Sequence, residues 1–181
     1  MSMGCPPIKY AGDVRKTDGV DPFRHPAVME WHKYLFTRWS SRRRTALLMP
    51  CTAKKPYGSS PTHKIAYAIA GPRVQVYSVS EPMLLVPREF EECYPFNGYD
   101  YPPELMTEEE RDEFVELLSR ALSSVSKYHV QMIAVLPSHH RRVLEEASGL
   151  AGVDVEIHPY GRLAFRSVKE AALRAEELAR G

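Results

Sequence analysis

Residues 50–64, with the sequence PCTAKKPYGSSPTHK, place a thiol, several amines, a phenol and an imidazole in one short stretch. Cys51 is the candidate nucleophile, because a thiolate is the strongest nucleophile among unmodified side chains. Lys54, Lys55 and His63 lie close to it in sequence, and neighbouring cations favour the thiolate over the thiol. An imidazole exchanges protons near neutral pH. The stretch therefore predicts covalent chemistry at Cys51, with His63 moving protons.

Each of these residues also has a purely structural interpretation. Cys51 can be a small buried residue at the end of a strand. Lys55, Pro56 and Tyr57 fit a tight turn, and Ser60 fits the N-cap of a following helix. Singly, these interpretations outweigh a catalytic role, but the complete set in one loop favours a functional site.

Neither a metal nor a cofactor is expected. The chain contains no CxxC pair to join Cys51 and His63, and the adjacent His139 and His140 are expected on different faces of a helix. A glycine-rich phosphate-binding motif is also absent, so the sequence does not indicate ATP or a dinucleotide.

The elements that would position the reactive loop alternate between strands and helices. Strands are predicted at 45–50, 74–80, 83–87, 130–137 and 153–159, and helices at 26–40, 62–71, 107–125, 138–147 and 167–178. Helix starts are indicated by Ser138 and by two capping boxes, Thr107 with Glu110 and Ser167 with Glu170. We expect a three-layer α/β/α sandwich with a mainly parallel sheet, in which ligands bind beyond the carboxyl ends of the strands.

Length and composition fit one ordinary globular domain. The 181 residues suffice for one core, and 44% of them are hydrophobic while 26% are charged. Residues 1–21 contain scattered glycine and proline without periodicity and are expected to form a flexible arm, followed by a single α/β domain at 22–181. The long loop at 88–106 is rich in aromatic residues and is expected to be ordered.

Cysteine content and hydropathy indicate a cytoplasmic protein. Cys5, Cys51 and Cys93 are too few and too widely spaced for a disulfide framework, which fits a reducing compartment. No apolar run approaches the roughly 18 residues of a membrane span, so no membrane association is expected.

Basic residues flank the reactive loop in sequence. Arg42, Arg43 and Arg44 precede the strand at 45–50, and Lys54 and Lys64 follow it. Such runs are usually solvated faces, but here they are candidates for contacts with RNA phosphates. The net charge of +1 shows that any such patch is local.

As a pattern, residues 50–63 read PCxxxKPYxxSxxH, which resembles the signature of archaeosine synthase, the archaeal relative of tRNA-guanine transglycosylase. The matching positions are Pro50, Cys51, Lys55, Pro56, Tyr57, Ser60 and His63. The segments HPAVMEWHKYL and LLVPREFEECYPFNGYDYPP also resemble this family, so the resemblance covers most of the chain after about residue 22.

The resemblance implies a fold of the uracil-DNA-glycosylase type and a role in tRNA modification. Archaeosine synthase adds the side-chain amine of free lysine to the nitrile of 7-cyano-7-deazaguanine in tRNA, giving an amidine, without a nucleotide cofactor. A radical enzyme then completes archaeosine. Family members also carry a transglycosylase-like barrel and an RNA-binding PUA domain that do not occur here. The expected partners are therefore tRNA, free lysine, and a transglycosylase/PUA subunit or the radical enzyme.

The signature residues receive roles in this chemistry. Cys51 is expected to attack the nitrile and form a thioimidate that lysine displaces. Lys55 is expected to favour the thiolate, and Tyr57 and Ser60 to orient His63 or donate hydrogen bonds. The alternative is a noncatalytic RNA-binding domain or subunit in which the same loop only shapes a pocket, and a base-excising glycosylase is a weaker third possibility.

Further residues are expected to bind the substrates. Arg88 and Glu89 are candidates for holding the charged ends of free lysine, and Tyr94 and Tyr99 for stacking on an extruded base. Pro56 and Asp100 complete the predicted substrate-binding set.

Overall fold

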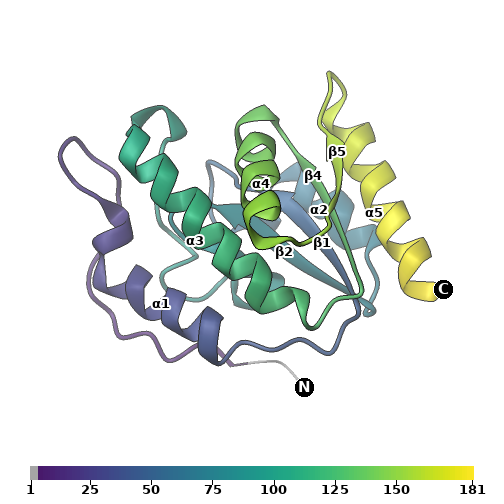
Figure 1. Ribbon diagram of the computed structural model, residues 1–181, viewed down its shortest axis with the longest axis horizontal. Helices are drawn as coiled ribbons and strands as arrows, with labels where there is room; N and C mark the ends of the chain where they lie inside the picture. The colour runs from purple at the N-terminus through teal and green to yellow at the C-terminus, as the bar shows by residue number, and fades with distance from the viewer. Residues whose placement is uncertain (1–3) are drawn as a thin grey trace.

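A five-stranded sheet forms the centre of the molecule. The computed structural model describes residues 4–181 and contains one sheet with the strand order β3-β2-β1-β4-β5 (Figure 1). The strands are β1 (Thr45–Pro50), β2 (Val74–Ser80), β3 (Leu84–Pro87), β4 (Gln131–Leu136) and β5 (Glu156–Pro159). All neighbouring pairs are parallel except β2 with β3. The predicted sheet is therefore confirmed.

Helices cover both faces of this sheet, which confirms the three-layer α/β/α architecture (Figure 1). The helices are α1 (Pro26–Thr37), α2 (Pro61–Ile69), α3 (Glu108–Ser126), α4 (Ser138–Ala151) and α5 (Ala164–Arg180). One face packs against α2 and α5, and the other against α1, α3 and α4.

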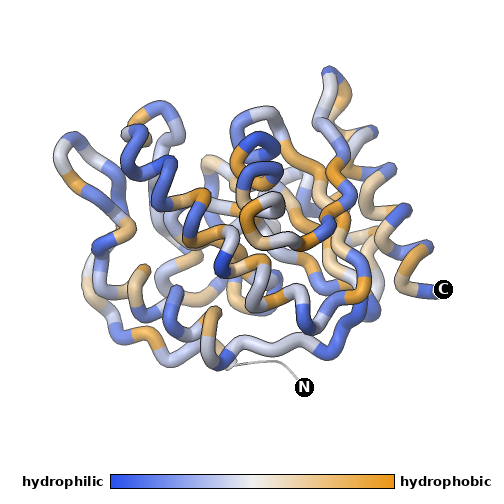
Figure 2. Tube along the Cα trace, in the orientation of Figure 1, coloured by the Kyte–Doolittle hydropathy of each residue, from blue (hydrophilic) through white to orange (hydrophobic). Residues whose placement is uncertain are grey.

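The central strand β1 shows how the two layers share one run of apolar residues. Leu47 and Met49 belong to the core on the α2 and α5 side, whereas Ala46 and Leu48 belong to the core on the opposite side. Every residue of β1 is buried, because a parallel strand covered on both faces has no solvent side. Hydrophobic residues accordingly concentrate along the central strands in Figure 2.

Two helix starts differ from the sequence prediction. Thr107 and Glu110 form the predicted capping box of α3. At α4, however, Pro137 occupies the N-cap position and Ser138 is already the first helical residue, without a side-chain cap. Helix α5 begins at Ala164 rather than near Ser167, whose hydroxyl instead donates to the carbonyl of Tyr160. Local sequence patterns do not include such tertiary contacts.

The N-terminal segment lies against the domain. Cys5 and Cys93 form a disulfide despite a sequence separation of 88 residues, so the expectation of unpaired cysteines is wrong for these two. Spacing along the chain does not reveal distance in space. Val14 is 2% exposed, and Lys16 pairs with Glu110 at 3.0 Å in a buried contact. Residues 1–3 of the expected arm lie outside the described residues.

None of the helices within residues 4–181 has the length and apolar character of a transmembrane segment.

Candidate functional site at the carboxyl edge of the sheet

The carboxyl ends of three adjacent parallel strands each lead directly into polar side chains. Cys51 follows β1, Glu81 follows β2, and His139 and His140 follow β4 after a two-residue connection. From β1 the chain crosses to β2 on one side, and β4 lies on the other side. This reversal is the place where α/β sheets form ligand-binding crevices.

A cavity of about 400 Å³ opens at this edge. Its ionisable lining residues are Cys51, Lys55, Glu81, Asp100, Tyr101, Glu104 and His140. The volume lies within the range of small-molecule pockets. Of the predicted catalytic residues, Cys51 and Lys55 line the cavity, and of the predicted substrate-binding residues Asp100 does.

Cys51 is the free cysteine among residues 4–181, and its thiol is only partly buried. The hydroxyl of Ser80 donates a hydrogen bond to its Sγ at 3.2 Å, and the hydroxyl of Tyr99 lies 3.7 Å away. The sulfur therefore sits among hydroxyl groups at the rim of a cavity rather than within packed aliphatic side chains.

A chain of hydroxyl groups ends at this sulfur. Tyr57 bonds Tyr99, and Tyr99 bonds Ser80. Each hydroxyl carries a single proton, so when Ser80 donates to Cys51 it must accept from Tyr99, which must in turn accept from Tyr57. Burial, together with the neighbouring Cys51, raises the pKa of both tyrosines well above the usual value, which keeps them protonated. Aligned hydroxyl dipoles of this kind stabilise negative charge on the sulfur.

Lys55 places a cation beside the same cavity. Its Nζ donates to the carbonyl of Thr52 and lies 4.6 Å from the centroid of the Tyr99 ring. The ammonium group is thus oriented by a backbone acceptor and an aromatic face.

His63 does not line the cavity. Its Nε2 lies 3.0 Å from the Ser78 hydroxyl, and its ring stacks on Tyr57 with centroids 5.8 Å apart. Burial, and secondarily the positive charge of Lys55, lowers the pKa of His63 to about 4. This placement supports Tyr57 from behind and leaves His63 outside the lining of the cavity.

The other signature residues hold the loop in place. Tyr57 is fully buried in a short helical turn that follows Pro56. Ser60 occupies the N-cap position of α2 but makes no cap hydrogen bond, and its hydroxyl pairs with that of Thr62 at 2.8 Å. Lys54 and Lys64 are exposed.

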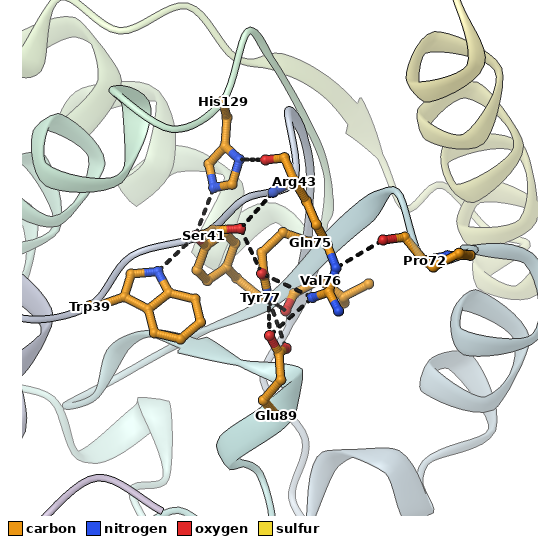
Figure 3. Close-up of polar contacts among 9 residues, drawn as sticks. All are labelled: Trp39, Ser41, Arg43, Pro72, Gln75, Val76, Tyr77, Glu89 and His129. Carbon is orange, nitrogen blue, oxygen red and sulfur yellow. Dashed lines mark hydrogen bonds and ion pairs between the residues drawn. The ribbon is translucent and has the colours of Figure 1, made fainter. Parts of the chain in front are cut away.

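Three of the predicted substrate-binding residues lie elsewhere. Arg88 stacks over the ring of Tyr67 at 3.9 Å. Glu89 lies near the amino end of β2, where its carboxylate is bonded by Arg43 and Gln75 (Figure 3). The Tyr94 hydroxyl donates to the Gly12 carbonyl at 2.7 Å and so fastens the N-terminal segment.

The arginine run lies at the opposite edge of the sheet from Cys51. Arg44 precedes β1 and Cys51 follows it, so the six residues of the strand separate them by roughly 20 Å. Arg42, Arg44 and the unpredicted Arg73 are exposed around a second depression at this amino edge. Arg43 instead joins the partly buried network of Figure 3.

Glu81, His139 and His140 were not among the predicted site residues. The side chain of Glu81 is fully buried, and its Oε2 lies 2.7 Å from His140 Nε2 and 3.9 Å from His139 Nε2. The expectation that the two histidines point apart is wrong, because both rings meet Glu81 at the first turn of α4. A sequence signal could have identified these three residues. Like Cys51, they lie just beyond the end of a buried parallel strand.

Helix α1 holds the turn that carries Glu81. The indole Nε1 of Trp31 donates to the Met83 carbonyl at 2.8 Å, and His32 Nε2 lies 2.7 Å from the Pro82 carbonyl. Leu84, at the end of this turn, has a φ of 75°, which is costly for a leucine and requires support from its surroundings. The segment HPAVMEWHKYL therefore contributes to the site by fixing the backbone after β2.

Comparison with known proteins yields one family match, to a model described as "Domain of unknown function (DUF5591)", over residues 28–170. The chain is 33% identical over 60% of its length to "Archaeosine synthase subunit alpha" of Methanosarcina acetivorans. It is 28% identical over 73% of its length to the protein of the same name from Thermococcus kodakarensis, and 35% identical over 55% to "Archaeosine synthase" of Methanocaldococcus jannaschii. The resemblance inferred from the signature is confirmed.

These matches cover a minor part of the relatives. The chain spans 18% of the Methanosarcina and Methanocaldococcus proteins and 24% of the Thermococcus protein. Among solved structures, "Crystal structure of AF0587, a protein of unknown function" matches with a TM-score of 0.62 and 24% identity, over 81% of this chain and 49% of that one. This likeness supports the fold.

Proposed function

The chain belongs to the DUF5591 family, and from this premise we propose that its carboxyl-edge cavity catalyses the amidine-forming step of archaeosine biosynthesis on tRNA. The observation that carries the proposal is the Cys51 thiol, which receives the end of a hydroxyl chain and faces a cavity of about 400 Å³. The relatives named archaeosine synthase supply the substrate class.

The proposed reaction begins with the Cys51 thiolate. The sulfur adds to the carbon of the nitrile of 7-cyano-7-deazaguanine, and the nitrile nitrogen takes a proton from the Lys55 ammonium, which gives a thioimidate. Ser80, which accepts a hydrogen bond from Tyr99, donates to the thiolate and stabilises it before the attack and when it later leaves. Lys55 replaces His63 in the proton transfer, because Lys55 lines the cavity and His63 does not.

The second half of the reaction releases the enzyme. The amine of free lysine adds to the thioimidate carbon and transfers a proton to neutral Lys55. Collapse of the tetrahedral adduct then expels the Cys51 thiolate and leaves the amidine on the base. The sum is one nitrile plus one amine giving one amidine, so no oxidant, reductant or nucleotide is consumed. Asp100 is suited to bind the α-ammonium group of the incoming lysine, because it is an acid at the rim of the cavity.

The tRNA must present its modified base at this edge. A base buried in folded tRNA reaches such a cavity only after extrusion, as in other enzymes that act on bases. The exposed Arg42, Arg44 and Arg73 at the amino edge are suited to phosphates of the same tRNA, because a distance of roughly 20 Å spans only a few nucleotides.

Trapping of the covalent intermediate tests the proposal. The chain is incubated with tRNA that carries 7-cyano-7-deazaguanine, without lysine, and intact mass spectrometry is used to detect a protein–tRNA adduct. The wild type is expected to form it and to release the amidine product on addition of lysine. Cys51→Ala is expected to form neither adduct nor product, and Lys55→Met to lower the rate of adduct formation by about 100-fold or more.

His63→Gln serves as the matched control within the same signature, since its expected effect is on stability and not on the covalent step. Full amidine formation by Cys51→Ala would refute the covalent route. Binding of tRNA without any product from the wild type would instead favour a noncatalytic RNA-binding subunit.

A further inference from the structure

Glu81, His139 and His140 form a cluster in the wall of the carboxyl-edge cavity. One potential ligand atom from each residue lies within 4.8 Å of the other two. Glu81 comes from the end of β2, and the two histidines come from the start of α4, so two segments of regular backbone bring them together.

Two atoms of this cluster are buried without hydrogen-bond partners in the described part of the chain. They are Oε1 of Glu81, whose side chain is fully buried, and Nε2 of His139. A buried carboxylate is unfavourable unless it is paired or coordinates a metal. The contact between Glu81 Oε2 and His140 satisfies one carboxylate oxygen and leaves both of these atoms unsatisfied.

The spacing of the cluster suits a small divalent ion. Ligands about 2.0–2.1 Å from a tetrahedral Zn²⁺ lie roughly 3.3 Å from one another. The two distances from Glu81 Oε2 to the imidazole nitrogens, 2.7 Å and 3.9 Å, lie on either side of this value. Small side-chain rotations would therefore bring all three residues into coordinating positions.

We propose that Glu81, His139 and His140 bind a divalent transition-metal ion of the Zn²⁺ class at the carboxyl edge of the sheet. Two imidazoles and one carboxylate form the ligand set of catalytic sites that keep a coordination position open. Glu81 and His140 line the cavity, so the open position faces it and accepts water or a nitrogen or oxygen atom of a bound molecule.

Outer contacts hold the ligands in place. Trp31 and His32 fix the turn that carries Glu81, and the ring of Phe114 packs edge-on to His140. Such support orients first-shell ligands at metal sites. The proposal goes beyond the amidine-forming reaction, which is balanced without a metal, and it is tested without an activity measurement.

Metal titration of the chelator-treated full chain tests the site. Co²⁺ is added while visible absorption is recorded, and Zn²⁺ binding is measured by calorimetry. The wild type is expected to bind one equivalent of each ion. Glu81→Gln, His139→Ala and His140→Ala are each expected to weaken Zn²⁺ binding by at least about 100-fold, because loss of an outer-shell partner alone costs roughly 10- to 100-fold.

His158→Ala is the matched control, because this histidine pairs with Glu156 away from the cavity and its loss is expected to leave the affinity unchanged. His139 is partly exposed, so its substitution reports on metal binding even if the buried variants fail to fold. Absence of stoichiometric binding by the wild type, or wild-type affinity in His139→Ala, would overturn the proposal.

Discussion

The two edges of the sheet each hold a glutamate close to buried polar side chains, yet their bonding differs. At the amino edge, Glu89 Oε1 accepts from Gln75 at 2.8 Å and Oε2 accepts from Arg43 at 3.0 Å (Figure 3). At the carboxyl edge, Glu81 Oε2 contacts His140 and Oε1 has no partner in residues 4–181. Both oxygens of the first carboxylate are bonded within the fold, whereas one oxygen of the second has no hydrogen-bond partner in this part of the chain.

The hydrogen-bonded network around Glu89 links three segments of the chain. His129 bonds the Arg43 carbonyl at 2.7 Å and the Tyr77 hydroxyl at 2.7 Å, and Trp39 donates to that hydroxyl at 3.0 Å (Figure 3). It joins the residues before β1 to β2 and to the segment before β4. A satisfied network of this kind fixes structure, whereas unsatisfied buried groups beside a cavity indicate binding.

Matched Glu→Gln substitutions at the two edges test most directly whether Glu89 and Glu81 differ in their contribution to stability. Glu89→Gln is expected to lower the free energy of unfolding by about 2 kcal/mol, because its NH2 group replaces one acceptor oxygen and faces a donor of either Arg43 or Gln75. Glu81→Gln in metal-free protein is expected to change it by less than about 0.5 kcal/mol, since the amide oxygen still accepts from His140 and a buried charge is removed.

Urea denaturation with and without Zn²⁺ provides the measurement. Zn²⁺ is expected to raise the stability of the wild type and of Glu89→Gln but not of Glu81→Gln. Equal destabilisation by the two substitutions would show that the two edges are structurally equivalent.

A second prediction uses His63, which lies between the two edges beside Ser78, Tyr57, Tyr67 and Lys55. Its pKa falls from 6.5 to about 4 on folding, so between these values the unfolded chain binds a proton that the folded chain does not. The free energy of unfolding therefore decreases as pH falls through this window, by about 2 kcal/mol at pH 5 from this residue alone.

Urea denaturation at pH 7 and pH 5 checks this sign, with His63→Gln as the comparison. The variant is expected to lose about 2 kcal/mol less than the wild type on acidification. His32 has a similarly lowered pKa but is present in both proteins, so its contribution cancels. An identical acid response in wild type and variant would disprove the assignment to His63.

The smallest effects are expected for the exposed arginines of the amino edge. Arg42→Ala and Arg44→Ala are expected to change stability by less than about 0.5 kcal/mol, because neither side chain is buried. Each is expected to lower the slope of log tRNA affinity against log salt concentration by about 1. Filter binding at several salt concentrations measures the slope, and Arg174→Ala on α5, whose side chain pairs with Glu156, is a suitable control. Unchanged slopes would remove this edge from the RNA-binding surface.

The sequence predicted the sheet and its covering helices because apolar runs and helical periodicity follow from burial alone. It also named Cys51, Lys55 and Asp100, which the structure places in the lining of the carboxyl-edge cavity. The first two came from the reactive loop that follows a strand, and Asp100 came from the family resemblance. The exact helix starts at Ala164 and Ser138 depend on tertiary contacts and on Pro137, which local capping patterns do not represent.

The site was only partly predictable, because proximity in sequence was taken for proximity in space. His63 lies twelve positions after Cys51, yet the intervening turn directs its ring toward Ser78. Glu81 and His140 are distant in sequence, but parallel strands end side by side and bring them into the same cavity. The contact between Glu89 and Arg43 was likewise not predictable from spacing. It forms because β3 runs antiparallel to β2 and returns the chain to the amino edge of the sheet.

The disulfide between Cys5 and Cys93 has a practical consequence for Cys51. With two of its three cysteines already joined, the oxidised chain presents a single free thiol, located in the lining of the cavity. A maleimide fluorophore or spin label would therefore attach at one known position without prior mutagenesis. Occupancy of the cavity could then be followed directly by the protection of that thiol from alkylation.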